Sequence, residues 1–453
     1  MGTGKRSNKY RGDKTGGLTV DEIRGTLQDA GATAEDLDRF DEVVSRRRFF
    51  GLIGRSGAAA ALLAGAGAGS EAMMQGLFGR GMIPAAWAEP ADAEIPGKPD
   101  MTIHNARPVN GEFAPHLLDD PVTPSSRHFV RNNGLVPERA KKQNLQGWSL
   151  TIDGEVHQPL KLTFDQLESM RQETYRFVVE CGGNGRALFD PPVRGNPWGR
   201  GAVACSEWTG VLLRDVLKEA GLKDTAVYTA HYGEDPPLKA DSPPFSRGVP
   251  VDKAMMDYTM IALKMNGQPI PALHGYPVRL IIPGWIGSAS QKWLNRIWIR
   301  DKVHDSKKMS GYAYRIPRYP VKPGTKPPKE DMVIATAWHI KSLITHPAEG
   351  ASLRVGQTVE VRGHAWAGED RVKKVFISTD YGVSWEKARL IKPRNRYAWY
   401  DFRASLGFDR KGYYEIWARA FDDQGQAQPF RQPWNPKGYL GNVIHRVPVL
   451  VGV

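Results

Sequence analysis

The sequence predicts an α+β protein in which a mixed α/β domain is followed by an immunoglobulin-like β-sandwich. Residues 128–316 combine strand-like alternation with helical spacing, whereas residues 332–453 show short alternating segments and almost no helical pattern. The stretch 317–331 between them contains five prolines, a composition typical of a linker. At 453 residues the chain also exceeds the usual size of one hydrophobic core. Two domains with extensions are therefore expected.

The elements of the first domain follow a lead-in, residues 89–127, which is rich in Pro, Asn and Asp and has little periodicity. Thr163 and Gln166 form a capping-box pattern that predicts a short helix through Met170. Helical spacing over 210–220, with Gly221 as a natural stop, predicts a second helix. Strands are expected over 148–156, 175–180, 226–230, 259–265, 278–282 and 296–300 in this domain, and over 358–366, 372–380, 398–406, 412–423 and 445–451 in the second.

The N-terminal region, residues 1–88, has the pattern of a twin-arginine signal. Residues 45–50 read S-R-R-R-F-F, an uncharged Ala/Gly-rich stretch follows at 56–70, and Ala86-Trp87-Ala88 forms an A-x-A cleavage pattern. The alternative is an arginine cluster before a buried Ala-rich helix. We expect a periplasmic protein that is exported folded, meets the membrane only during export and begins near Glu89 when mature.

The charge balance favours an anionic ligand or partner. The chain has a formal net charge of +13, and the excess lies mostly after the signal region. A positive surface can attract nucleic acid, an anionic membrane, an acidic protein or a small anion. Because no Lys/Arg-dense run interleaved with aromatic residues occurs, nucleic acid is disfavoured.

The chain has two cysteines, Cys181 and Cys205. There is no CxxCH motif for covalent c-type haem, and the absence of a CxxC pair disfavours zinc. Cys181 follows an alternating segment and opens the glycine-rich turn CGGNGR. Its ordinary interpretation is a small buried hydrophobe, which is also how we interpret Cys205. One thiolate can hold a soft metal only when a cofactor supplies further ligands, which points to molybdenum bound by a pterin dithiolene.

Five motifs in the same order make the mature chain resemble the sulfite oxidase family over residues 128–453. They are FVRNNGLVP, VECGGNGR, GAVACSEWTGVLLRDVL, MNGQPIPALHGYPVRLIIPGWIGSASQKWL and WNPKGYLGNVIHRVPV. The combination of RGNPW with CSEWTG is most similar to bacterial periplasmic sulfite dehydrogenases without haem. The resemblance implies a molybdopterin-binding catalytic domain over 128–316 and a dimerisation domain over 332–453, and hence a homodimer.

The resemblance also implies a set of substrate-site residues. Cys181 matches the molybdenum ligand, and Trp198 matches a pocket tryptophan. Arg131, Arg186 and Arg446 match arginines that bind the substrate, and guanidinium groups suit a small dianion such as sulfite. Tyr312 is the expected active-site tyrosine, with Tyr314 as the alternative.

The residues implied to bind the molybdopterin are Asn133, His274, Arg279, Ser288, Ser290 and Lys292. Two positions depart from the family pattern, since Asn133 stands where many members have His and Ala289 where many have Arg. Phosphate anchoring is therefore expected to depend more on Lys292 and backbone amides.

The expected function is oxidation of sulfite to sulfate at a molybdenum-pterin centre, with electrons passing to a c-type cytochrome. One alternative is the sulfane dehydrogenase subunit of a thiosulfate-oxidising complex, and another is a periplasmic molybdenum sulfoxide reductase. A secreted two-domain binding protein is the alternative from a different class.

Overall fold

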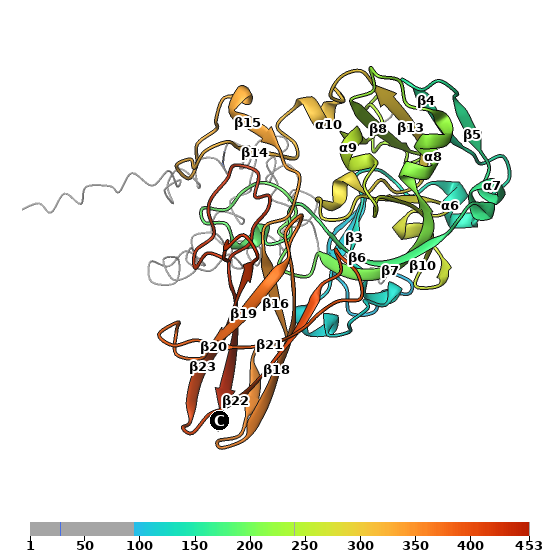
Figure 1. The fold of residues 1–453 in the computed structure, drawn as a ribbon. Coiled ribbons are helices and arrows are strands. Elements are labelled where there is room, and N and C mark those ends of the chain that lie inside the picture. Colours follow the sequence, from blue (N-terminus) through green and yellow to red (C-terminus); the bar gives the residue numbers. More distant parts are fainter. Residues whose placement is uncertain (1–27, 29–94, 240, 453) are drawn as a thin grey trace, which may run out of the picture. The chain divides into compact units, whose positions relative to one another are not determined.

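A computed structural model describes residue 28 and residues 95–239 and 241–452 of the chain (Figure 1). The twin-arginine motif, the Ala/Gly-rich stretch and the cleavage pattern lie outside these residues. All strands described below belong to one unit, Ala88–Val453. Within the described residues, no helix has both the length and the apolar character needed to cross a membrane.

The first domain contains two five-stranded sheets, and helix α8, with one buried face, connects a strand of one sheet to a strand of the other. One sheet has the order β5-β4-β13-β8-β9, and only the β4–β13 pair is parallel. The other has the order β11-β10-β7-β6, with β12 also paired to β10. The bounds are β4 Leu150–Gly154, β5 Leu160–Leu162, β6 Glu173–Glu180, β7 Val203–Leu212, β8 Tyr228–Gly233, β9 Ser246–Pro250, β10 Met260–Met265, β11 Gln268–Pro269, β12 Arg279–Ile281 and β13 Leu294–Arg300.

Five short helices connect these strands and the segments around them. The predicted capping box is confirmed, because the Thr163 side chain accepts from the Gln166 backbone and the Gln166 side chain accepts from the Thr163 backbone. The second predicted helix begins later than expected, since residues up to Leu212 continue strand β7. The bounds are α6 Glu138–Lys142, α7 Phe164–Ser169, α8 Leu213–Ala220, α9 Val251–Ala254 and α10 Lys307–Ser310.

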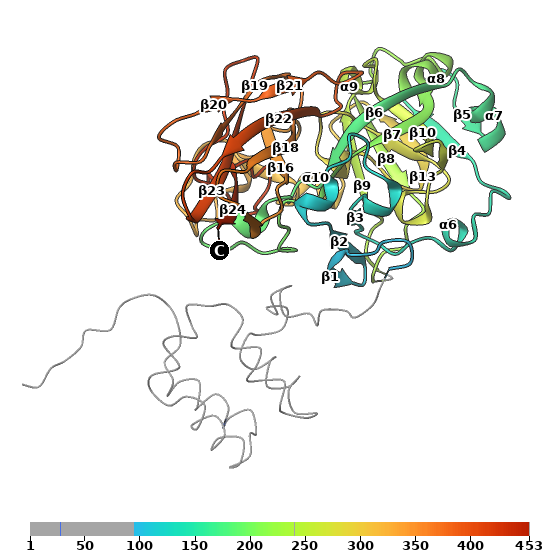
Figure 2. The same cartoon turned by 90° about the horizontal axis from the view of Figure 1, so that it is seen from below.

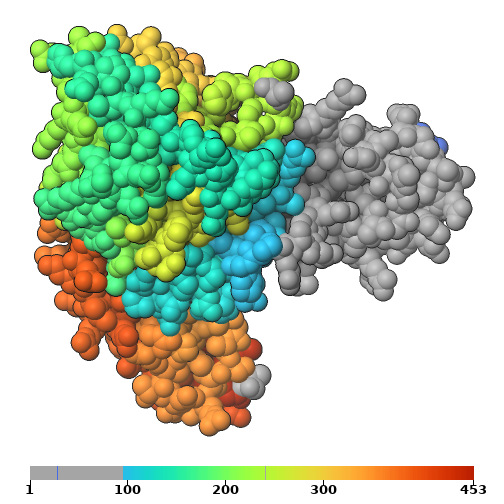
Figure 3. Space-filling model, turned by 90° about the vertical axis from the view of Figure 1, so that its right-hand side faces the viewer, coloured from blue at the N-terminus to red at the C-terminus, as the bar shows by residue number. Residues whose placement is uncertain are grey.

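The lead-in has more structure than its composition predicts. Strands β1 (Thr102–Ala106), β2 (Val109–Glu112) and β3 (Val130–Arg131) form an antiparallel sheet. The amide of Asn266 donates to the carbonyl of Thr123, which fastens the segment to the first domain. Figure 3 shows the lead-in in blue beside yellow residues of that domain. Its backbone is therefore part of the folded unit, although its sequence lacks strand periodicity.

The proline-rich stretch forms a loop whose two ends lie on paired strands. Strand β14 (Arg315–Pro317) pairs with β15 (Met332–Ile334), so residues 318–331 leave and return to the same two-stranded sheet. Proline has no backbone N–H to donate, and it is tolerated in this loop because the β-sheet hydrogen bonds end at β14 and β15.

The C-terminal region is a two-sheet β-sandwich, as Figures 1 and 2 show. One sheet has the order β16-β18-β22-β21 and the other β17-β24-β23-β19-β20. Apolar residues from both sheets fill the space between them, among them Val361, Phe402 and Ile416. The predicted α+β class with a C-terminal sandwich is confirmed. The bounds are β16 Lys341–His346, β17 Ala351–Leu353, β18 Thr358–Trp366, β19 Val372–Ser378, β20 Glu386–Lys387, β21 Arg389–Ile391, β22 Tyr400–Gly407, β23 Gly412–Asp422 and β24 His445–Val451.

Candidate active site

A cavity in the first domain gathers most of the site residues expected from the sequence. It lies where the ends of β3 and β6 meet the loops around β12 and β13. The expected residues that line it are Arg131, Asn133, Cys181, His274, Arg279, Ser288, Ser290 and Lys292.

Cys181 is delivered to the cavity by strand β6, which ends at the preceding residue. Its backbone N–H donates to the Ala202 carbonyl, and its own carbonyl accepts from the Asn184 N–H at 2.8 Å. Gly183 leaves room for the Arg186 side chain, since a Cβ there would lie 2.3 Å from a guanidinium nitrogen of Arg186. Cys181 is a free thiol, and the described residues contain no cluster of three or more His, Cys, Asp or Glu suited to a metal ion. The protein thus offers one sulfur ligand at this point of the cavity.

Arg131 lies close to Cys181 in the same cavity. Burial acts to lower the pKa of Arg131, but the nearby Tyr314, Cys181 and Tyr439 outweigh it and raise that pKa. Its guanidinium donates to the side-chain oxygen of Asn133 at 2.8 Å. A permanently charged donor therefore stands beside the thiol, as binding of a small oxyanion requires.

The other end of the cavity carries buried positive charge. Burial lowers the pKa of Arg279 to about 9 and holds the pKa of Lys292 well below its usual value. Burial likewise holds the pKa values of His128 and His274 well below normal, so both rings are neutral. Asp235 is the carboxylate residue among the lining residues, and burial raises its pKa to about 7. Asp235 is thus the one acidic group of the lining set against Arg279 and Lys292, and an anionic ligand would favour the charged forms of both.

Several polar atoms at this end have no hydrogen-bond partner among the described residues. They are the Nε of Arg279, the Oγ of Ser288, the Oε1 of Gln291 and the Oδ1 of Asp235. Because buried polar groups are normally paired, the set indicates that a ligand completes the site. Donors and cations suit phosphate oxygens, while Asp235 and Gln291 offer acceptors for a heterocycle's N–H groups. The residues present therefore fit a phosphate-bearing pterin, with Cys181 left for its metal.

Among the lining residues that were not predicted as site residues, three carry polar side chains: His128, Asp235 and Gln291. Tyr314, named as the alternative to Tyr312, also lines the cavity. His128 directly precedes FVRNN and Gln291 stands between Ser290 and Lys292, so both had a local signal in the motifs. Asp235 had no such signal, because it lies in the loop after β8, outside every motif used.

Tyr314 lines the cavity, whereas Tyr312 does not. The Tyr312 hydroxyl donates to the carbonyl of Pro327, in the proline-rich loop. The Tyr314 hydroxyl donates to the side-chain oxygen of Asn133 at 3.3 Å, and its ring stacks on Tyr439. Residues 312–314 form a bend and a turn, and Tyr314 has a positive φ of 55°, so the two side chains part and Tyr314 takes the place expected for Tyr312.

The remaining expected residues lie outside the lining of this cavity. Arg186 is buried and donates to the carbonyls of Asn196 and Lys437. Trp198 is fully buried in the apolar cluster that includes Cys181. Arg446 is exposed on β24, where its guanidinium lies 4.2 Å from the centre of the Trp417 ring. The structure therefore brings Arg131 to Cys181 but leaves Arg446 on the sandwich surface.

Two family descriptions match the chain. Residues 134–308 match the oxidoreductase molybdopterin binding domain, and residues 333–452 match the Mo-co oxidoreductase dimerisation domain. Mitochondrial sulfite oxidase of Mus musculus is 30% identical over 392 residues, which cover 82% of this chain and 69% of that protein. The chain belongs to the sulfite oxidase family.

Other relatives agree with this membership. Mitochondrial sulfite oxidase of Drosophila melanogaster is 33% identical over 372 residues, 76% of this chain and 62% of that protein. The chain spans 62–69% of the length of these two relatives. The NADH nitrate reductase of Ulva prolifera is 29% identical over 80% of this chain and 44% of its own length.

A solved structure also resembles this sulfite oxidase family member. The sulfane dehydrogenase SoxCD from Paracoccus pantotrophus has a TM-score of 0.61 and 27% identity, covering 75% of this chain and 84% of that one. This likeness agrees with membership of the sulfite oxidase family.

Proposed function

We propose that the chain is a periplasmic sulfite dehydrogenase that oxidises sulfite to sulfate and passes the electrons to a c-type cytochrome. The observation that carries this proposal is the cavity in which the single thiol of Cys181 lies beside the half-buried Arg131. When bound, the molybdenum cofactor supplies oxygen transfer to sulfur and accepts two electrons. Overall, sulfite and water give sulfate, two protons and two electrons, and each cytochrome accepts one electron.

The cationic end of the cavity would hold the cofactor. Arg279 and Lys292 would bind its phosphate, and Ser288 would donate to the same anion through an Oγ that has no partner among the described residues. Ser290 differs, because its hydroxyl already accepts from the Ile282 N–H at 3.0 Å. Asp235 would accept hydrogen bonds from the heterocycle.

The substrate end would be formed by Arg131 with Asn133 and Tyr314. The Asn133 oxygen accepts from Arg131 and from the Tyr314 hydroxyl, so the amide fixes both donors. A guanidinium held in this way is preorganised for an oxyanion and costs little reorganisation on binding. The sulfite anion would therefore meet fixed donors close to Cys181.

The similarity to SoxCD favours one second candidate, a sulfane dehydrogenase subunit. That protein is described as a sulfane dehydrogenase, and this chain shares 27% identity with it. The two functions differ in substrate, since a sulfane sulfur on a carrier is far larger than free sulfite.

An anaerobic assay on protein with quantified molybdenum tests the proposal. Sulfite-dependent reduction of cytochrome c in proportion to molybdenum content supports it. Protein without molybdenum, after expression in a host that makes the cofactor, would overturn the enzyme assignment. Molybdenum-loaded protein that ignores sulfite but oxidises a carrier-bound sulfane would replace the first candidate by the second.

Export and assembly form separate parts of the proposal. N-terminal sequencing of protein recovered from the periplasm should begin near Glu89, and replacement of Arg46 and Arg47 by Lys should abolish export. Sedimentation should give a homodimer through residues 332–453, whereas a monomer at micromolar concentration would contradict it.

A further inference from the structure

We propose that Lys341 and Trp366 of the β-sandwich are positioning residues that set the geometry of the Cys181 loop through the carboxylate of Glu180. This inference rests on the proposed function, in which Cys181 holds the metal. It assigns the second domain a part in the active site in addition to its place in a dimer.

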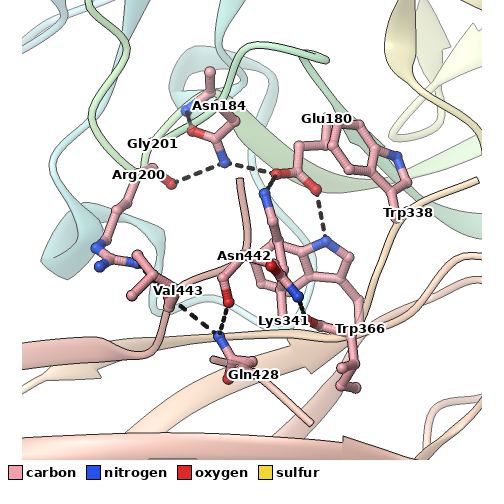
Figure 4. Close-up of polar contacts among 12 residues, drawn as sticks. Glu180, Asn184, Arg200, Gly201, Trp338, Lys341, Trp366, Gln428, Asn442 and Val443 are labelled. Carbon is pink, nitrogen blue, oxygen red and sulfur yellow. Dashed lines mark hydrogen bonds and ion pairs between the residues drawn. The ribbon is translucent and has the colours of Figure 1, made fainter. Parts of the chain in front are cut away.

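Glu180 is the last residue of β6 and directly precedes Cys181, yet its side chain is fully buried. One carboxylate oxygen accepts from the ammonium of Lys341 and from the amide of Asn184 at 2.9 Å. The other accepts from the indole N–H of Trp366 at 2.7 Å. Figure 4 shows these three donors converging on the carboxylate. Two of them come from the sandwich.

Lys341 and Trp366 reach Glu180 together because they are register partners. Lys341 is the first residue of β16 and Trp366 is the last of β18, and the two strands pair antiparallel with these residues opposite each other. Opposed residues on adjacent strands present their side chains side by side. The paired ends of β16 and β18 thus hold two hydrogen-bond donors in place for one carboxylate.

Asn184 transmits the position of Glu180 to the thiol loop. Its backbone N–H donates to the Cys181 carbonyl at 2.8 Å, and its side-chain oxygen accepts from the Ala202 N–H at 3.1 Å. Ala202 in turn accepts from the Cys181 N–H. The loop of residues 181–184 is therefore fixed on both sides by a network whose centre is Glu180.

A second set of hydrogen bonds between the domains lies next to this network. The Arg200 guanidinium donates to the carbonyls of Val443 and Ile444, which precede β24. A small pocket lined by Asn184, Arg200, Lys341 and Trp366 among others lies beside these contacts (Figure 4).

The test compares Lys341→Met, the double variant Glu180→Gln/Lys341→Met, and Trp366→Phe with the wild type. Removing one partner of a buried ion pair is destabilising, whereas replacing both charges together is often close to neutral. The double variant therefore separates folding from positioning. Lys387→Met, at an exposed position on β20, is the matched control.

We expect kcat to fall about tenfold in the double variant, with KM for sulfite unchanged, because residues behind a metal ligand typically contribute on this scale. The sulfur-to-molybdenum charge-transfer absorption should shift in the same variant. Apoprotein can be made in a host that lacks the cofactor. Alkylation of Cys181 should be faster in the apoprotein of the double variant than in wild-type apoprotein. Trp366→Phe should change each property in the same direction but less.

Each outcome decides a different question. A double variant with wild-type kcat, absorption and alkylation rate would overturn the positioning role, whatever the stability of Lys341→Met. If Lys341→Met does not accumulate, the double variant and Trp366→Phe give the same decision. Wild-type protein without molybdenum would end the proposed function, and the alkylation rates of the apoprotein would still test the coupling of Lys341 to Cys181.

Discussion

The ammonium of Lys98 lies 2.6 Å from the Nε2 atom of His274, although 176 residues separate the two in sequence. Lys98 is buried and also donates to the carbonyls of Ser125 and His128. A charged lysine has no acceptor, so Nε2 accepts and the neutral His274 ring carries its proton on Nδ1. The lead-in therefore fixes the tautomer of a cavity residue.

Replacing Lys98 by Met should weaken retention of the cofactor. Without the ammonium, the His274 ring loses its fixed tautomer and the cationic end of the cavity loses one charge. We expect pterin and molybdenum content after purification to fall about tenfold, in the range seen for groups that orient ligand residues. Lys142→Met, at an exposed position of α6, is the control, and equal cofactor content in both variants would remove Lys98 from this role.

The pH dependence of anion binding by the apoprotein should follow Lys98. Burial lowers the pKa of Lys98 from 10.5 to about 7, so between these values the unfolded chain binds more protons than the folded one. The free energy of unfolding of the apoprotein should therefore rise with pH across this window, by at most about 1.4 kcal/mol per pH unit from this group. A bound anion favours charged Lys98, so anion affinity should fall as the pH rises above 7.

Thermal shifts of the apoprotein with pyrophosphate measure this effect. Stabilisation should be larger at about pH 6.5 than at about pH 8.5, and Lys98→Met should flatten the difference. Burial also raises the pKa of Asp235 from 3.8 to about 7, and its ionisation above that pH weakens anion binding in the same direction, so the difference that persists in Lys98→Met measures the share of Asp235. A difference unchanged in Lys98→Met would assign the pH dependence to another group.

Tyr314→Phe should lower turnover, and Tyr312→Phe should not. The Tyr314 hydroxyl is bound to Asn133 in the cavity, while the Tyr312 hydroxyl is bound to the Pro327 carbonyl outside it. Loss of one hydrogen bond of this kind predicts a decrease in kcat of about tenfold for Tyr314→Phe. Steady-state kinetics on molybdenum-normalised protein measure both variants, and the reverse order would restore Tyr312 as the site tyrosine.

Arg131→Gln should raise the KM for sulfite, whereas Arg446→Gln should leave it unchanged. Arg131 lines the cavity beside Cys181, and Arg446 is exposed over Trp417. Loss of a charge-assisted hydrogen bond predicts an increase in KM of about tenfold or more. If Arg446→Gln shows the larger increase, the substrate must approach the sandwich surface. Arg186→Gln stays a prediction of raised KM, with stability measured alongside because Arg186 binds two carbonyls.

Cys181→Ser should give a folded protein with negligible sulfite oxidation, and Cys205→Ala should keep the activity. Cys205 is fully buried, and burial raises the pKa of its thiol to about 12, which makes it inert. Kinetics normalised to molybdenum, together with circular dichroism, separate loss of the ligand from loss of the cofactor or of the fold. Full sulfite oxidation by Cys181→Ser would refute the ligand assignment.

Most of the fold and the central part of the site could be read from local patterns. Alternation identified β6 and its delivery of Cys181, the capping box identified α7, and the motif around Ser288 and Lys292 identified one wall of the cavity. Such features depend on residues within a few positions of one another. Strands β1 and β2 escaped prediction because their polar residues pair with each other and show no apolar alternation.

Local spacing is enough to predict the order of domains, the thiol that follows β6 and the type of residues in the binding loops. Packing of distant segments is what brings Tyr314 and not Tyr312 to the cavity, places Lys98 against His274 and leaves Arg446 on the surface. It also joined Glu180 to Lys341, 161 residues apart. Contacts across such separations depend on how strands and loops pack, and no local period records them.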